Sequence, residues 1–230
     1  MIPLRDDNPS SSTPLVTISL VAACVLVFLW QASLGPQRGE QIVYALGVIP
    51  AVLLGQRELP PELVLVPPTL TTITSMFMHG GWMHLIGNML YLWIFGDNVE
   101  DSMGHVRFLV FYLLCGLAAV FAQALPEPSS TIPMVGASGA ISGVLGAYLL
   151  LYPHARVLVV IPLGFVLQTA RIPAGIVLVL WFGLQLLSNL MTQAGNGGVA
   201  FRAHIGGFVA GMALIPLFKQ RRFRLRTPWT

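Results

Sequence analysis

The chain contains repeated apolar runs of about 20 residues, separated by stretches that are rich in polar residues, proline and glycine. An α-helix needs roughly this length to cross about 30 Å of hydrocarbon. Across the 230 residues, 55% are hydrophobic and only 9% are charged, whereas soluble domains carry about 25% charged residues. These runs therefore predict an all-α, multi-pass membrane protein rather than a soluble domain.

Six of the runs are predicted to cross the membrane. We expect these spans at residues 14–34, 82–95, 106–125, 135–152, 172–191 and 200–218. The first run is too long for the apolar part of a signal peptide, and it follows Asp6 and Asp7, so we expect a span rather than a cleaved leader. A polar tail at residues 1–13 and a basic tail at residues 219–230 flank the spans.

The connections between the spans differ in character. Residues 35–78 form a long, largely apolar connection, which we expect to be a loop lying partly in the membrane. Residues 96–104 are predicted to be a short polar link, and Gly195–Gly198 a loop before the last span. Residues 157–170 are too few to cross, so we expect a surface or re-entrant segment there.

The basic residues predict the orientation. With both termini cytoplasmic, nine of the 12 Lys and Arg residues lie inside and three lie outside, as the positive-inside rule requires. The outer three are Arg38, Arg57 and Arg202. The spans that begin near residues 82, 135 and 200 then all enter from the outside, and each carries polar residues near its start. These polar residues are His84, Asn88, Ser138 and His204. We therefore expect them to lie at one common depth.

Their chemistry suggests a nucleophilic site. Polar groups inside a bilayer are costly and are functional candidates by default. A serine hydroxyl becomes a good nucleophile when a base such as histidine takes its proton, which predicts Ser138 as nucleophile and His204 as base. His84 and Asn88 are one helical turn apart and could donate hydrogen bonds to an oxyanion. No Asp or Glu lies at this depth, so the sequence supports a dyad at most.

Glycines near these residues predict close helix packing. The pairs Gly139/Gly143 and Gly207/Gly211 follow the small-x3-small pattern that lets two helices approach closely. Gly136 and Gly139 flank Ser138 and would leave room for a substrate backbone.

Three motifs resemble those of the rhomboid family of intramembrane serine proteases, over about residue 69 to the end of the sixth span. They are Gly136-Ala-Ser138-Gly139, His79-x4-His84-x3-Asn88 and Ala203-His204-x2-Gly207-x3-Gly211. The resemblance implies a six-span catalytic domain at residues 14–218 that cleaves transmembrane segments of single-span membrane proteins through an acyl-enzyme. It implies the Ser138–His204 dyad, and oxyanion binding by His84, Asn88 and the Ser138 N–H. It also implies that the protein needs no metal, cofactor or nucleic acid.

Residues around the motifs receive secondary roles. Ser142 and Gly87 stand where some family members carry aromatic residues, so we expect them to shape the substrate pocket. Trp181 and Phe182 are candidates for lipid-facing packing or for a substrate gate. His79 is expected to position its loop. The first loop lacks the Trp-Arg pair of many members.

Other classes of protein stay open at this point. Each serine or histidine could serve helix packing alone. A transporter or channel would also bury His, Asn and Ser, although acidic relay residues or paired broken helices would then be expected. A metal enzyme could use His79, His84 and His204, but the first two lie about 140° apart around a helix. A rhomboid-like protein without catalysis is a further alternative.

Overall fold

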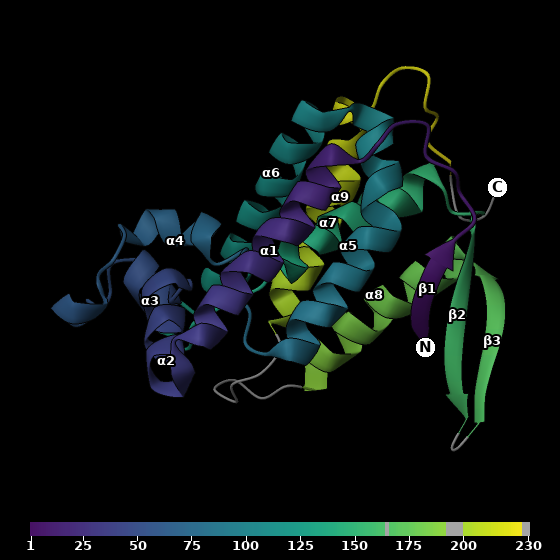
Figure 1. Cartoon of the computed structure of the whole chain (residues 1–230). Helices are drawn as coiled ribbons and strands as arrows, with labels where there is room; N and C mark the ends of the chain where they lie inside the picture. The colour runs from purple at the N-terminus through teal and green to yellow at the C-terminus, as the bar shows by residue number, and fades with distance from the viewer. Residues whose placement is uncertain (164–165, 192–199, 227–230) are drawn as a thin grey trace.

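The computed structural model describes residues 1–163, 166–191 and 200–226, and it is mostly helical (Figure 1). Within these residues, four helices are long and apolar enough to cross a membrane. They are α1 (Leu15–Ser33), α6 (His105–Ala124), α8 (Ala174–Met191) and α9 (Phe201–Phe218). Their ends lie within two residues of four predicted spans. The predicted loop at Gly195–Gly198 lies outside the described residues.

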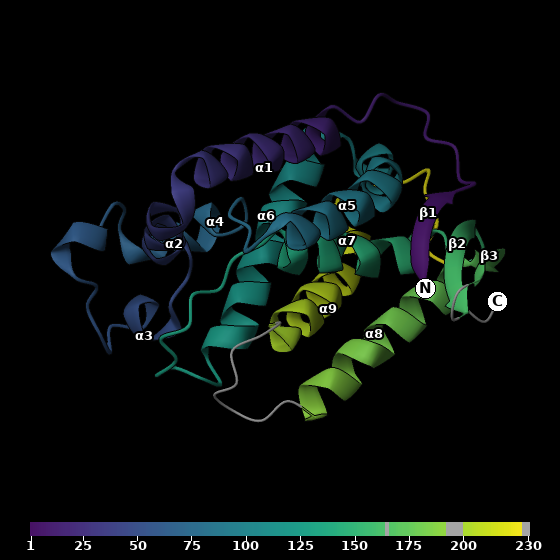
Figure 2. The same cartoon turned by 60° about the horizontal axis from the view of Figure 1, so that its bottom comes forward.

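Two further helices complete the bundle, α5 (Trp82–Met103) and α7 (Ser138–Leu151). They correspond to the predicted spans 82–95 and 135–152, and that they cross the membrane stays a prediction. Helix α7 is the centre of the bundle, because it packs against α5, α6, α8 and α9, and nearly all of its residues are buried. Figure 2 shows α7 behind α5, with α8 beside α9 at the edge of the bundle.

Glycines bring α7 and α9 into backbone contact. A Cβ atom on Gly211 would lie 2.0 Å from the carbonyl oxygen of Gly143, and one on Gly146 would lie 2.2 Å from the carbonyl oxygen of Phe208. No side chain fits in these places. The predicted close approach of the two helices is therefore present.

Helix α5 extends to Met103, so the predicted polar link at 96–104 is wrong. Glu100 near the end of α5 is fully buried, and it accepts hydrogen bonds from the segment that begins α1. Glu100 accepts from the backbone N–H groups of Val16 and Thr17, at 2.9 and 2.7 Å, and from the Thr17 hydroxyl at 2.7 Å. Glu100 also contacts His105 Nδ1 at 2.6 Å. Glu100 thus fixes the start of α1 to the end of α5, a role that its polarity alone does not reveal.

The all-α prediction is wrong in one part, because the chain also forms a three-stranded antiparallel sheet. Strand β1 (Ile2–Asp6) comes from the predicted polar tail, and β2 (Arg156–Leu163) and β3 (Val166–Pro173) replace the predicted surface or re-entrant segment. Burial along β2 has a period of two, with Val157 and Val159 buried and their neighbours partly exposed. This alternation of β-branched residues is typical of a half-buried strand.

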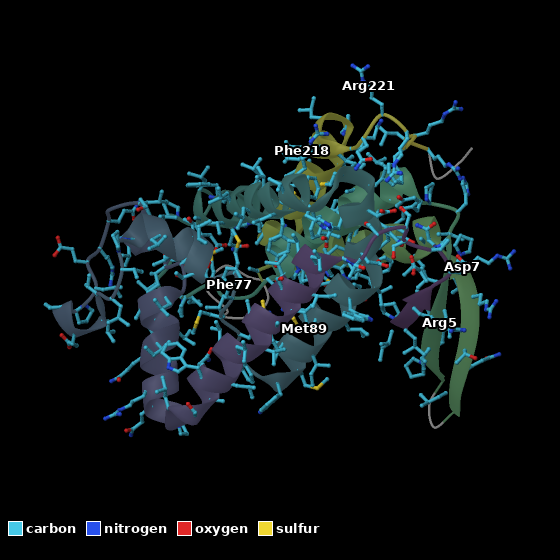
Figure 3. All side chains as sticks on the ribbon, turned by 45° about the horizontal axis from the view of Figure 1, so that its top comes forward. Arg5, Asp7, Phe77, Met89, Phe218 and Arg221 are labelled. Atoms are coloured by element: carbon cyan, nitrogen blue, oxygen red, sulfur yellow. The ribbon has the colours of Figure 1, made fainter. Side chains whose placement is uncertain are left out.

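The sheet lies at the end of the bundle where α8 begins, and it includes the N-terminal strand β1 (Figure 1). Asp6 at the end of β1 accepts a hydrogen bond from the Tyr148 hydroxyl of α7. Burial raises the pKa of Asp6 to about 6. The start of the basic tail folds back on the bundle, since Gln220 N–H donates to the Ser102 carbonyl at 2.8 Å. Figure 3 shows Arg5 and Asp7 beside the sheet, and Arg221 beyond Phe218.

The long first connection contains short helices rather than an irregular loop. They are α2 (Gly35–Leu46), α3 (Pro50–Leu53), the 3-10 helix η1 (Pro61–Leu63) and α4 (Pro68–Thr74). Prolines stand in the first turn of α2, α3, η1 and α4, where their missing N–H has no helical partner to lose. In Figure 1 these helices lie on the side of the bundle opposite the sheet.

Candidate active site

Ser138 and His204 are hydrogen-bonded to each other across the contact between α7 and α9. Ser138 is the first residue of α7, and its Oγ lies 2.8 Å from Nε2 of His204. His204 is buried, with 9% of its surface exposed. The glycine contacts between the two helices set this distance, because a Cβ atom on Gly207 would lie 2.0 Å from the Gly139 carbonyl oxygen. Two residues 66 positions apart thus meet at hydrogen-bond distance.

The segment before Ser138 is held by the first connection. Val48 and Met134 exchange two backbone hydrogen bonds of 3.0 and 2.7 Å, and Gly136 N–H donates to the Ser75 carbonyl at 2.9 Å. Residues 135–137 precede the helix, although they were predicted to belong to the span. The φ angle of Gly136 is +119°, a conformation that L side chains rarely adopt. This turn delivers Ser138 to the N-terminus of α7.

Gly136 makes room for a histidine, and that it also leaves room for a substrate stays a prediction. A Cβ atom on Gly136 would lie 2.7 Å from Cε1 and Nε2 of His84. The other ring nitrogen of His84, Nδ1, accepts a hydrogen bond from Gly80 N–H at 3.3 Å. A neutral imidazole has one donor and one acceptor nitrogen, so His84 Nε2 carries the hydrogen. His84 therefore presents a donor beside the backbone that leads into Ser138.

Asn88 lies one turn further along α5, on the same wall of the site. Its Nδ2 donates to the His84 carbonyl at 3.0 Å, and only 7% of the residue is exposed. An amide nitrogen has two hydrogens, so the second one remains for another acceptor. His84 and Asn88 thus bring two N–H donors to one side of the site.

A single cavity of about 1220 Å³ joins these groups. Its lining includes all four predicted polar residues, His84, Asn88, Ser138 and His204. The three helices thus bring these residues to one cavity, and their common depth in a membrane stays a prediction. Several other predicted residues also line the cavity, namely Gly87, Ser142 and Trp181.

The two serines of α7 have different partners. Ser142 is fully buried, and its hydroxyl donates to the Ser138 carbonyl at 2.6 Å. His204 instead contacts Ser138. Spacing alone could not separate these serines, and the structure assigns the histidine contact to Ser138.

Trp181 and Phe182 take different positions on α8. The Trp181 ring lies 6.0 Å from that of His204 and lines the cavity. The Phe182 ring stacks on Phe208 of α9 at 4.4 Å. Trp181 is thus placed for contact with a ligand, and Phe182 for packing between the two helices.

Two further residues lie at the margin of the site. His79 is buried, its Nδ1 lies 3.2 Å from the Phe77 carbonyl, and its ring meets that of His84 edge-on at 5.3 Å. These contacts suit a residue that positions its loop. Arg202, one of the three basic residues predicted to lie outside, forms an ion pair of 2.6 Å with Glu127.

Sequence reasoning missed Gln185 of α8. Its Oε1 lies 2.8 Å from Nδ1 of His204, so both ring nitrogens of this histidine have partners. The available signal was a polar residue one turn after Trp181 in a largely apolar helix, followed at helical spacing by the polar residues Ser188 and Asn189. The predicted dyad therefore has a third, neutral neighbour.

The alternative metal site is not assembled by the described residues, which include no group of three His, Cys, Asp or Glu side chains placed to hold an ion. Of its three histidines, His204 is engaged through both nitrogens.

Comparison with known proteins agrees with this geometry. Residues 68–221 match the Rhomboid domain. The chain is 31% identical over 201 residues to Rhomboid protease GluP of Bacillus subtilis, an alignment that covers 87% of this chain and 35% of that protein. It is 30% identical over 192 residues to mitochondrial Rhomboid protein 1 of Saccharomyces cerevisiae, with 75% of this chain and 52% of that protein covered.

A plant relative is similar to the same degree. RHOMBOID-like protein 5 of Arabidopsis thaliana is 30% identical over 142 residues, which is 62% of this chain and 41% of that protein. The alignments with these three proteins span between about a third and about half of the relatives' own lengths.

Proposed function

Because the chain belongs to the rhomboid family, we propose that it is an intramembrane serine endopeptidase, which cleaves transmembrane segments of other membrane proteins. The observation that carries this proposal is the 2.8 Å contact between Ser138 Oγ and His204 Nε2 at the wall of a large cavity. A serine that shares its proton with a histidine is the activated nucleophile of acyl transfer.

The reaction follows from the roles of these two groups. His204 Nε2 takes the Ser138 proton while Oγ attacks the substrate carbonyl carbon. The tetrahedral intermediate collapses when His204 returns the proton to the leaving amine, which leaves an acyl-enzyme on Ser138. Water, deprotonated by His204, then attacks the ester and releases the second product. This sequence needs no metal or cofactor.

The negative charge on the carbonyl oxygen is stabilised by preorganised donors. His84 Nε2–H and the Asn88 amide provide two from α5, and the Ser138 N–H provides a third. Ser138 begins α7, where the first N–H groups of a helix have no acceptors within it and the helix dipole is positive. Such donors are each worth about 10² to 10³ in rate.

The family also suggests the setting of the reaction. We propose six spans within residues 14–218, a first connection that lies partly in the membrane, and both termini in the cytoplasm, in a cell or inner membrane. The substrates are single-span membrane proteins. Gly87, Ser142 and Trp181 line the cavity and would contact the residues next to the cleaved bond.

The test is cleavage of a panel of single-span substrates by the purified protein in detergent. Ser138→Ala and His204→Ala should each abolish cleavage, and the double variant should be no worse, since the two residues act as a unit. A fluorophosphonate should label Ser138, and Ser142→Ala should keep activity as the matched serine control. Cleavage that survives Ser138→Ala, or an adduct on Ser142, would overturn the assignment.

A further inference from the structure

A third side chain completes the arrangement around His204. We propose that Gln185 is a positioning residue, which orients His204 and fixes its tautomer, so that the working unit is Gln185–His204–Ser138. This inference rests on the proposed function. It concerns a residue on α8 that lies outside the three motifs and has no charge.

The contacts of His204 hold its ring on two sides. Gln185 Oε1 lies 2.8 Å from Nδ1, and Ser138 Oγ lies 2.8 Å from Nε2. Trp181, one turn before Gln185, places its ring 6.0 Å from the imidazole at an interplanar angle of 35°. The same face of α8 thus binds the edge of the imidazole through Gln185 and places the tilted Trp181 ring beside it.

The partners dictate where the ring hydrogen lies. The Oε1 atom of glutamine only accepts hydrogen bonds, so Nδ1 of the neutral imidazole must be the donor. Nε2 is then the unprotonated nitrogen, and it faces the Ser138 hydroxyl. In the other tautomer, Nε2 would carry the hydrogen and could not take the serine proton. Gln185 therefore favours the one tautomer in which His204 can act as a base.

The setting of Gln185 supports a dedicated role. Helix α8 is apolar enough to cross a membrane, and a polar side chain in such a helix is costly unless it finds a partner. An amide suits this position because its oxygen accepts the hydrogen bond from His204 without the cost of burying a charged side chain. A carboxylate partner, which the sequence lacks at this depth, is thus replaced by a neutral one.

The experiment compares three variants of the full-length protein in detergent. Gln185→Met keeps the length of the side chain but removes the acceptor, whereas Gln185→Glu keeps an acceptor oxygen in either protonation state. Leu184→Met is the control, because it introduces the same side chain at an exposed neighbouring position outside the cavity lining. The measurements are kcat, KM and thermal stability, with Ser138→Ala assayed in parallel.

We expect Gln185→Met to lower kcat by about 10- to 100-fold, because the loss of positioning removes a part of what general-base catalysis contributes. KM should stay within about threefold of the wild-type value. Gln185→Glu should recover kcat to within about fivefold, and Leu184→Met should match wild type. Any one of three results would overturn the inference. They are a wild-type kcat in Gln185→Met, equal losses of kcat in the Met and Glu variants, and a change in KM alone. Cleavage by Ser138→Ala would instead overturn the proposed function.

A spectroscopic readout covers the case in which Gln185→Met does not fold. The ¹⁵N chemical shifts of the His204 ring in the wild-type protein distinguish the two neutral tautomers. We expect the hydrogen on Nδ1. A neutral His204 with its hydrogen on Nε2 would overturn the inference without any substitution.

Discussion

Gly207 of α9 lies directly against the backbone of Gly139 in α7, the residue after Ser138, so that a Cβ atom on Gly207 would be 2.0 Å from the Gly139 carbonyl oxygen. A backbone atom cannot move aside as the end of a flexible side chain can. The pairing of Ser138 with His204 therefore depends on an absent methyl group three residues after the histidine.

Gly207→Ala should separate the two helices. We expect a loss of about 1–3 kcal/mol in stability, typical of overpacking, together with a fall in activity. Thermal denaturation in detergent and the cleavage assay measure the two effects. Gly183→Ala in α8 is the matched control, because its Cβ atom would meet nothing within 4 Å. Equal stability of the two variants would contradict the packing argument.

The donors on α5 should act mainly in the transition state. His84→Ala and Asn88→Ala are expected to lower kcat by about 10- to 10³-fold with little change in KM. Ile86→Ala lies between them on α5, outside the cavity lining and half exposed, and should keep wild-type kcat. If either donor variant raised KM alone, that residue would belong to substrate binding.

The pH dependence of stability should contain a contribution from Asp6. Burial raises its pKa from 3.8 to about 6, so the folded protein holds this proton more tightly than the unfolded chain does. This contribution is fully present below about pH 4 and is lost as the pH rises through about 6.

Asp6→Asn removes this titration, so its melting temperature should fall less than that of the wild type between pH 4 and pH 7. Thermal denaturation across that range measures the difference. Glu62→Gln, which removes an exposed carboxylate from η1, should retain the wild-type profile. An Asp6→Asn variant with an unchanged profile would show that another group is responsible.

The proposed orientation can be checked by cysteine labelling in intact cells. Cys24 and Cys115 are both buried, so they should give little background. A cysteine at exposed Glu62 should react with an impermeant thiol reagent, whereas one at exposed His154 should react only after the membrane is opened. The reverse pattern would invert the topology and place the site at the other surface.

The sequence alone predicted those site residues that occur in groups, either one helical turn apart or within a motif. Ser138, His204, His84 and Asn88 were all identified in this way, and the structure brings them to one cavity. Gln185 was missed because its helix was judged by overall hydropathy, and the polar residues Ser188 and Asn189 that follow it at helical spacing were not weighed. Its role depends on which way α8 faces, and that is a property of packing.

The fold was predictable where length and hydropathy decide it. The ends of α1, α6, α8 and α9 lay within two residues of the expected spans. The continuation of α5 through Glu100 was not predictable, because polar residues suggest a loop unless their distant partners at Val16 and Thr17 are known. The sheet was missed because residues 157–170 were judged by their length alone, and the β-branched residues Val157, Val159, Val160 and Ile161, which are typical of a strand, were not weighed.

The cavity has a further consequence for the supply of water. Each hydrolysed peptide bond consumes one water molecule, and hydrocarbon provides none. A cavity of about 1220 Å³ with polar side chains on several walls has room for tens of water molecules at roughly 30 Å³ each. Ser138 lines this cavity, so water held there would form a reservoir next to the acyl-enzyme. In the proposed reaction, the second step would draw on this reservoir, and the cut would occur where a substrate helix leaves lipid and enters water.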